Sequence, residues 1–190
     1  MRISLQVSKL FVLLLIIVYL TVQCSLQNVI SKMASSLSKV FVYGTLKRGQ
    51  PNHYWLTNSN NGFASFLTNG TTKDKYPLVI STQYNIPFLL NNPGIGKNIK
   101  GEIYEIDSEM LSKLDILEDY PELYDRQIED IVTKDGLVPC WVYLLRKFPP
   151  KLLDKTYLEE YASTNDLPYL ESYSNSTEPD DVFDISKDQL

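Results

Sequence analysis

Short apolar runs alternate with clusters of turn residues over most of the chain. Between Ser38 and Phe148 these runs are rich in Val, Ile, Tyr and Phe, a composition that favours strands over helices. Gly, Asn, Asp and Pro residues separate them, and Asn69–Lys75 is one of the predicted turns. The predicted strands are Val40–Tyr43, Phe63–Thr68, Tyr76–Ser81, Pro87–Leu90, Gly101–Ile106, Arg126–Val132 and Val138–Leu145.

One segment in the middle of the chain has helical periodicity instead. Its apolar residues recur with the spacing of a single helix face; they are Met110, Leu111, Leu114 and Leu117. Asp107 or Ser108 is a suitable N-cap, and Pro121 ends the helix near Asp119 or Tyr120. Several short strands and one main helix predict an α+β fold.

The N-terminal region differs from this body. Arg2 and Lys9 precede an uncharged apolar run, Leu10–Val22. This is the layout of a signal peptide, and the run is short for a membrane span, which needs about 20 residues. Residues 1–27 are therefore predicted to be a signal peptide or signal anchor, which places the protein in the secretory pathway, secreted or in the ER lumen. The alternative is translation from Met33, which places it in the cytosol.

Three other features depend on which alternative holds. Asn69 and Asn175 lie in Asn-x-Ser/Thr sequences, and the chain ends Lys187-Asp188-Gln189-Leu190, one substitution away from an ER-retention signal. Glycosylation and retention both require entry into the secretory pathway.

The remaining boundaries follow from changes in composition. Residues 28–37 are predicted to be a linker and residues 38–169 a single folded domain. Lys151–Ala162, which follows two prolines, is expected to form a peripheral helix. Residues 170–190 are polar and acidic, and we expect this tail to be disordered.

The charge and the scarce cysteine and histidine exclude several classes of protein. The net charge is -5 and no basic cluster is present, so nucleic acid is a poor partner. The chain has two cysteines, Cys24 and Cys140, and one histidine, His53. A zinc site needs about four such ligands, and a catalytic triad would have to use His53, which is expected to be structural.

The run Val40–Tyr43 leads directly into Gly44, Thr45 and Leu46, and Pro51 follows. A buried strand that ends in a glycine-containing turn before a helix leaves backbone N–H groups unpaired, and these can hold a carboxylate or phosphate. No Gly-Lys-Ser/Thr sequence follows, so this is not a P-loop. The same residues also fit an ordinary strand end, and the pattern alone does not decide between the two.

Glu118 is the main candidate for proton transfer. It borders the apolar face of the predicted helix and lies in its last turn, where burial and the helix dipole both raise a carboxylate pKa towards the range of a general base. The alternative is a surface carboxylate paired with Lys113 or Arg126. Asp115 and Asp119 are expected on the solvated face.

Taken together, six blocks of sequence resemble the gamma-glutamylcyclotransferase-like (AIG2-like) family. The blocks are VFVYGTLKRGQPNH at Val40–His53, YPLVI at Tyr76–Ile80, NIPFLLNNPGIGK at Asn85–Lys97, GEIYEID at Gly101–Asp107, MLSKLDILEDYPELYDR at Met110–Arg126 and FPP at Phe148–Pro150. No single block is decisive, but six in register are specific. The N-terminal leader and the acidic tail lie outside the resemblance.

The resemblance implies a small mixed, mostly antiparallel β-barrel with one main α-helix. It also implies that Tyr43, Gly44, Thr45 and Leu46 bind a γ-glutamyl group through main-chain N–H groups, and that Glu118 is the catalytic carboxylate.

The implied reaction is cyclisation of the γ-glutamyl group of ε-(γ-glutamyl)-lysine or a related γ-glutamyl amine to 5-oxoproline. The expected partner is this small-molecule substrate, with no metal or organic cofactor, no membrane contact beyond the N-terminal segment, and a monomer as the default state. Two alternatives remain open. The first is the same reaction on γ-glutamyl amino acids or glutathione, and the second is a non-catalytic small-ligand or protein-binding module on this fold.

Overall fold

The computed structural model of the protein describes residues 15–27 and 37–170. Several predicted features lie wholly or partly outside these residues: the start of the apolar run before residue 15, the linker at 28–36, and the acidic tail with its Asn175 sequence and C-terminal Lys187–Leu190. The chain divides into two compact units, Met1–Leu37 and Ser38–Leu190.

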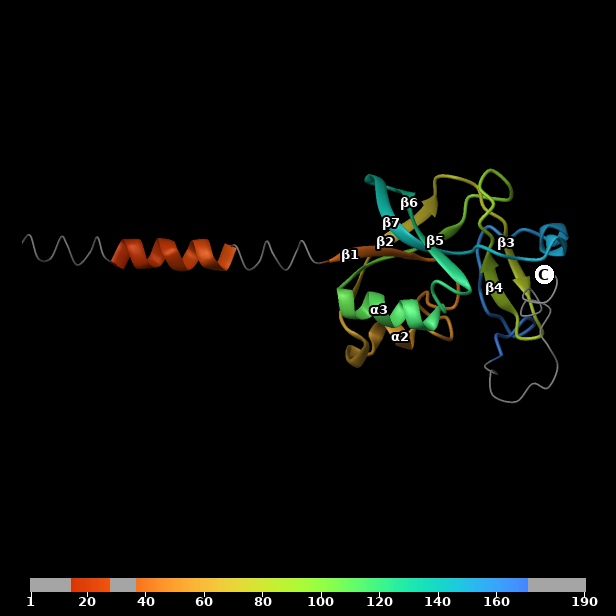
Figure 1. Cartoon of the computed structure of the whole chain (residues 1–190), viewed down its shortest axis with the longest axis horizontal. Helices are drawn as coiled ribbons and strands as arrows, with labels where there is room; N and C mark the ends of the chain where they lie inside the picture. Colours follow the sequence, from red (N-terminus) through yellow and green to blue (C-terminus); the bar gives the residue numbers. More distant parts are fainter. Residues whose placement is uncertain (1–14, 28–36, 171–190) are drawn as a thin grey trace, which may run out of the picture. The chain divides into compact units, whose positions relative to one another are not determined.

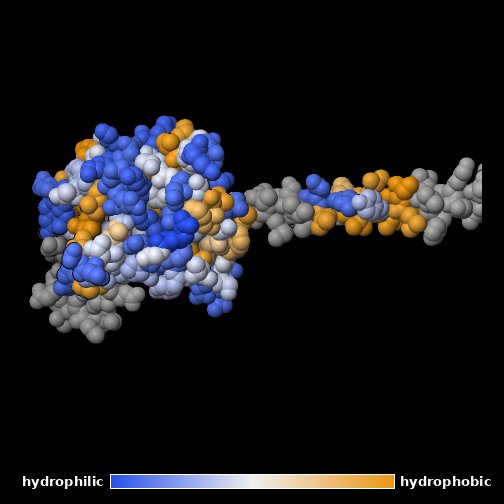
Figure 2. Space-filling model, turned by 180° about the vertical axis from the view of Figure 1, so that it is seen from behind, coloured by the Kyte–Doolittle hydropathy of each residue, from blue (hydrophilic) through white to orange (hydrophobic). Residues whose placement is uncertain are grey.

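In the N-terminal unit, residues 15–27 are helical. Its large apolar side chains, such as Leu15 and Leu20, are exposed. Figure 2 shows hydrophobic residues beside hydrophilic ones on the surface of this helix. Across the described residues, every helix falls short of the length and apolar character needed to cross a membrane.

The second unit is built on a closed five-stranded barrel with the strand order β1-β5-β2-β6-β7 (Figure 1). The strands of the barrel are β1 (Ser38–Val42), β2 (Ala64–Thr72), β5 (Lys100–Ile106), β6 (Tyr124–Thr133) and β7 (Gly136–Leu145). All neighbours pair antiparallel except β1 and β7, which close the barrel in parallel through Val40 and Trp141. The predicted α+β barrel is therefore confirmed.

Smaller elements surround the barrel. β3 (Leu78–Ser81) and β4 (Ile86–Leu89) form a separate hairpin, and Figure 1 shows it beside the barrel, with α2 and α3 along another side. The helical elements are α2 (Tyr54–Thr57), α3 (Ser108–Leu117) and the 3₁₀ turns η1 (Ser59–Asn61) and η2 (Pro150–Asp154). Each of the seven predicted strands and the predicted main helix is present.

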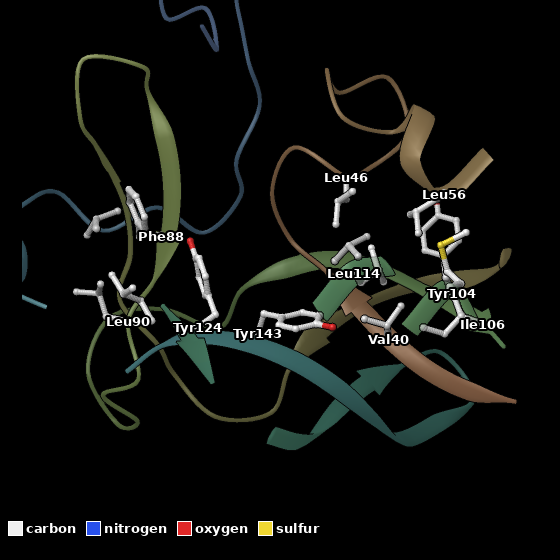
Figure 3. Close-up of a cluster of buried hydrophobic side chains, with 14 of the residues drawn as sticks. Val40, Leu46, Leu56, Phe88, Leu90, Tyr104, Ile106, Leu114, Tyr124 and Tyr143 are labelled. Atoms are coloured by element: carbon white, nitrogen blue, oxygen red, sulfur yellow. The ribbon is translucent and has the colours of Figure 1, made fainter. Parts of the chain in front are cut away.

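Strand β1 is a continuous apolar run because both of its faces are covered. Val40 and Val42 belong to one buried cluster, and Phe41 and Tyr43 belong to the other. Alternation of polar and apolar residues is expected only where one face of a strand meets water. Figure 3 shows the first cluster, in which Val40 lies near Leu114 of α3 and Tyr143 of β7.

Helix α3 has the predicted cap and apolar face. The Asp107 side chain accepts a hydrogen bond from the Met110 N–H at 2.8 Å, which satisfies one of the free donors at the helix start. Met110 and Leu114 are fully buried. The helix ends at Leu117, slightly earlier than predicted, and Glu118 is its C-cap.

Two local predictions were wrong. Asn69–Thr72 was expected to lie in a turn, but β2 continues through it and pairs with β6. Gly70 serves close packing there, because a Cβ at this position would lie 2.4 Å from the Ile131 side chain.

The helix expected at Lys151–Ala162 is also absent. Only the short 3₁₀ segment η2 is helical, and the residues that follow it form no helix. Leu158 donates a backbone hydrogen bond to Leu78 O at 2.8 Å, and Lys100 donates one to Glu159 O at 2.8 Å. Backbone groups of β3 and β5 thus bind this segment through hydrogen bonds that a helix would not leave free, and local helix propensity does not prevail.

Candidate active site

The turn that follows β1 offers several unpaired backbone donors. Lys47 N–H donates to Gly44 O and Asn52 N–H donates to Thr45 O, but within residues 37–170 the N–H groups of Gly44, Thr45 and Leu46 have no backbone or side-chain acceptor. A run of free N–H groups in a turn attracts anions. Helix α2 begins at Tyr54 with His53 as its N-cap, so the helix predicted after this turn is present, although it is only four residues long.

The walls of the turn are fixed by tight packing. The Tyr43 hydroxyl donates to the Tyr143 carbonyl oxygen at 2.9 Å. Burial, followed by the nearby negative charge of Glu118, raises the Tyr43 pKa well above its usual value, so this hydroxyl stays protonated. Gly44 lies against the hairpin, because a Cβ there would be 2.9 Å from Pro87 Cγ. A larger residue at position 44 would displace the turn.

Glu118 carries an unpaired carboxylate. Its backbone N–H donates to Leu114 O at 2.9 Å, which holds the residue at the end of α3. In the part of the chain that the structure describes, no group donates a hydrogen bond to its side chain and no cation pairs with it. Burial raises the pKa of Glu118 from 4.5 to about 7, because desolvation opposes the charged form.

The turn and the carboxylate meet at one cavity of about 120 Å³. Tyr43, Gly44, Thr45, Leu46 and Glu118 all line it. All five predicted site residues therefore come together, although Glu118 is distant from the turn in the sequence.

Other parts of the domain complete the wall of this cavity. The additional lining residues are Phe41, Val42, Asn52, Ile86, Pro87, Phe88, Leu117, Leu123, Tyr124, Tyr143 and Tyr169. Figure 3 shows Tyr124 between Phe88 and Tyr143, and the rings of Phe88 and Tyr124 are stacked with their centroids 6.3 Å apart. Glu118 thus lies in mainly apolar and aromatic surroundings, which explains its raised pKa.

Arg126 does not pair with Glu118, and Asp115 is not on the solvated face. The Asp115 carboxylate accepts a hydrogen bond from the Tyr143 hydroxyl at 2.6 Å and forms an ion pair with Arg126 at 3.0 Å. The guanidinium of Arg126 also lies over the rings of Trp141 and Tyr120. No pattern in the sequence predicts this network, because only the pairing of β6 with β7 brings Arg126 opposite Tyr143.

The remaining nucleophilic and metal-binding candidates lie elsewhere. His53 Nδ1 is 2.9 Å from Leu46 O, a contact that supports the turn from outside the cavity lining. Cys140 is buried, and burial raises the pKa of its thiol to about 12. No group of His, Cys, Asp and Glu suited to holding a metal ion occurs among residues 15–27 and 37–170.

The fold is a closed β-barrel, and its cavity combines an unpaired carboxylate with an anion-accepting turn. These features are those of a small-molecule enzyme that transfers protons. Residues 40–163 match the family described as gamma-glutamyl cyclotransferase, AIG2-like. The chain belongs to this family.

Individual relatives support this assignment. The chain is 54% identical to the Troponin C-akin-1 protein of Drosophila melanogaster, over 73% of this chain and 84% of that protein. It is 49% identical to gamma-glutamylaminecyclotransferase C of Danio rerio, over 69% of this chain and 90% of the relative. The crystal structure of an AIG2-like protein from Mus musculus superposes with a TM-score of 0.70 at 39% identity, covering 73% of this chain and 99% of the mouse chain.

Proposed function

We propose that this protein is a gamma-glutamylamine cyclotransferase that converts the γ-glutamyl group of ε-(γ-glutamyl)-lysine or a related amine to 5-oxoproline. The observation that carries the proposal is the unpaired Glu118 carboxylate, whose pKa is about 7, in the same cavity as the free N–H groups of Gly44, Thr45 and Leu46. The names of several relatives support the same reaction.

The reaction needs positioning and proton transfer more than a protein nucleophile. The substrate's α-amine attacks its own δ-carbonyl carbon, a five-membered lactam forms, and the bond to the leaving nitrogen breaks. Holding the two ends of the γ-glutamyl group in this geometry is worth roughly 7–11 kcal/mol of the barrier. The turn at Gly44–Leu46 holds the α-carboxylate, which places the amine and the carbonyl within the cavity.

Glu118 moves the protons. The α-ammonium must lose two protons as it becomes the lactam N–H, and the leaving nitrogen must gain two to depart as an ammonium. A carboxylate with a pKa of about 7 both accepts and releases protons readily near neutral pH. One side chain therefore serves first as base and then as acid.

The size of the cavity favours a small ligand over a protein-binding role. A cavity of about 150 Å³ holds one benzene molecule, so a space of about 120 Å³ suits a compact head group such as γ-glutamyl. The preference for ε-(γ-glutamyl)-lysine over other γ-glutamyl compounds is the finer part of the proposal. It would place the protein in the breakdown of isopeptide-crosslinked proteins.

The full-length protein should be tested with ε-(γ-glutamyl)-lysine, γ-glutamyl-alanine and glutathione, following 5-oxoproline over a range of pH. Wild type should act best on ε-(γ-glutamyl)-lysine. Its kcat/KM should rise as the pH increases past about 7, because Glu118 ionises there. Glu118→Gln should lower kcat by about 10²–10⁴, and Glu122→Gln, an exposed neighbour, should leave it unchanged.

Undiminished turnover in Glu118→Gln would remove Glu118 from the mechanism. Preference for glutathione or γ-glutamyl-alanine would change the assigned substrate but keep the reaction. Failure of the wild type on all three compounds would favour a non-catalytic binding module.

A further inference from the structure

The segment from Ser163 to Leu170 begins where the family match ends, at residue 163, and its residue Tyr169 lines the cavity. One end is tied to the loop after β1, because Ser163 N–H donates to Gln50 Oε1 at 2.8 Å. The other end is tied to the β3–β4 turn, because Asn85 Nδ2 donates to Pro168 O at 2.8 Å and Leu170 N–H donates to Tyr84 O at 3.1 Å.

The two anchoring elements also supply two walls of the cavity. Residues of the loop after β1 form one wall, and Ile86, Pro87 and Phe88 of the hairpin form another. A segment fastened to both therefore crosses from one wall to the other. Tyr169 is its residue in the cavity lining, and its backbone is held by a 2.8 Å hydrogen bond from Tyr169 N–H to Ser163 Oγ.

The Tyr169 hydroxyl is joined to the anion-accepting turn by one side chain. Asn52 Nδ2 donates to Thr45 Oγ1 at 3.1 Å and to the Tyr169 hydroxyl oxygen at 3.3 Å. Asn52 lines the same cavity. The hydroxyl oxygen is thus an acceptor towards Asn52, and within the described residues its own proton has no acceptor.

We propose that Tyr169 is a further substrate-binding residue, whose hydroxyl donates a hydrogen bond to the carboxylate held by the Gly44–Leu46 turn. This rests on the proposed function, in which that carboxylate is the α-carboxylate of the γ-glutamyl group. The Asn52 amide orients the hydroxyl by donating to one lone pair of its oxygen, and the hydroxyl proton is then directed to the bound anion. Tyr169 therefore distinguishes ligands that carry the carboxylate from ligands that lack it.

Product binding tests this independently of turnover. 5-Oxoproline carries the carboxylate, and 2-pyrrolidinone is the same ring without it. NMR titrations of both ligands should be performed on the full-length wild type, on Tyr169→Phe, and on Tyr54→Phe as a control at an exposed tyrosine. Tyr169→Phe should weaken 5-oxoproline binding about 10- to 100-fold, the effect of one hydrogen bond to a charged group, and should leave 2-pyrrolidinone binding unchanged. Tyr54→Phe should change neither.

Turnover should show the matching change. With ε-(γ-glutamyl)-lysine, Tyr169→Phe should raise KM by a similar factor while kcat changes little, because the lost contact is made to the bound substrate and to the transition state alike. Asn52→Ala should also weaken 5-oxoproline binding. The double variant, with Tyr169→Phe and Asn52→Ala together, should lose no more binding free energy than the two single variants lose in sum.

Three results would overturn the assignment. Equal weakening of both ligands in Tyr169→Phe would mean that the segment merely closes the cavity. Unchanged 5-oxoproline binding in Tyr169→Phe, with a wild type that binds and forms 5-oxoproline, would reject the role of Tyr169 alone. A wild type that neither forms nor binds 5-oxoproline would reject the proposed function, and the role of Tyr169 with it.

Discussion

Replacing Glu118 by glutamine should stabilise the fold at neutral and higher pH. The carboxylate is held in an apolar cavity without a partner among the described residues, and burial raises its pKa from 4.5 to about 7. The folded state therefore binds the proton more tightly than the unfolded chain does. Glutamine has nearly the same shape and carries no charge at any pH, so the substitution removes only the cost of the buried charge.

The sign and size of the effect follow from linkage. Between pH 4.5 and pH 7 the folded protein holds a proton on Glu118 that the unfolded chain has lost, so this group makes stability fall as the pH rises. Each pKa unit corresponds to 1.36 kcal/mol, which gives a cost of about 3 kcal/mol above pH 7. Glu118 keeps some solvent access, so we expect roughly 1–3 kcal/mol after allowing for solvent screening.

Urea unfolding at pH 4 and pH 8 measures this directly. Glu118→Gln and wild type should have similar free energies of unfolding at pH 4, where Glu118 is mostly protonated in both states. At pH 8 the variant should be more stable by the amount above, with an unchanged denaturant slope. The matched control is Glu122→Gln, whose side chain is exposed and whose effect should be small at both pH values.

Two results would refute this reasoning. A Glu118→Gln variant that is less stable than wild type at pH 8 would mean that the carboxylate accepts stabilising hydrogen bonds in the native protein. An equal gain at pH 4 and pH 8 would mean that the effect comes from packing and not from ionisation.

Two further predictions concern α3 and the network beside the cavity. Asp107→Ala should lower the free energy of unfolding by about 1 kcal/mol, because it removes the cap bond to Met110; kcat should stay at the wild-type value, and a loss of activity without a loss of stability would contradict a purely structural cap. Asp115→Asn should lower the free energy of unfolding by roughly 2–4 kcal/mol in urea titrations, because it leaves the largely buried Arg126 charge without its partner. An unchanged free energy of unfolding would show that solvent or another group compensates the charge of Arg126.

Much of the local structure follows from the order of residues. Strand β1 and helix α3 are predictable because their apolar residues recur with the spacing of the element that they form. The Asp107 cap is predictable because aspartate before an apolar helical run satisfies free N–H groups. By contrast, the predictions for Asn69–Thr72 and Lys151–Ala162 were wrong, because neighbouring strands supply hydrogen-bond partners that no local pattern records.

For the site, the types of residue can be read from the sequence, but their proximity cannot. A glycine-containing turn after a buried strand, a carboxylate beside an apolar helix face and the lack of a rival nucleophile are all properties of short segments. Packing of helix α3 against β1 and the turn brings Glu118 to the cavity, and burial in that cavity raises its pKa. The tertiary structure also pairs Asp115 with Arg126 and brings Tyr169 to the cavity. These interactions join residues far apart in the chain, and their energies depend on burial and distance, which only the folded chain defines.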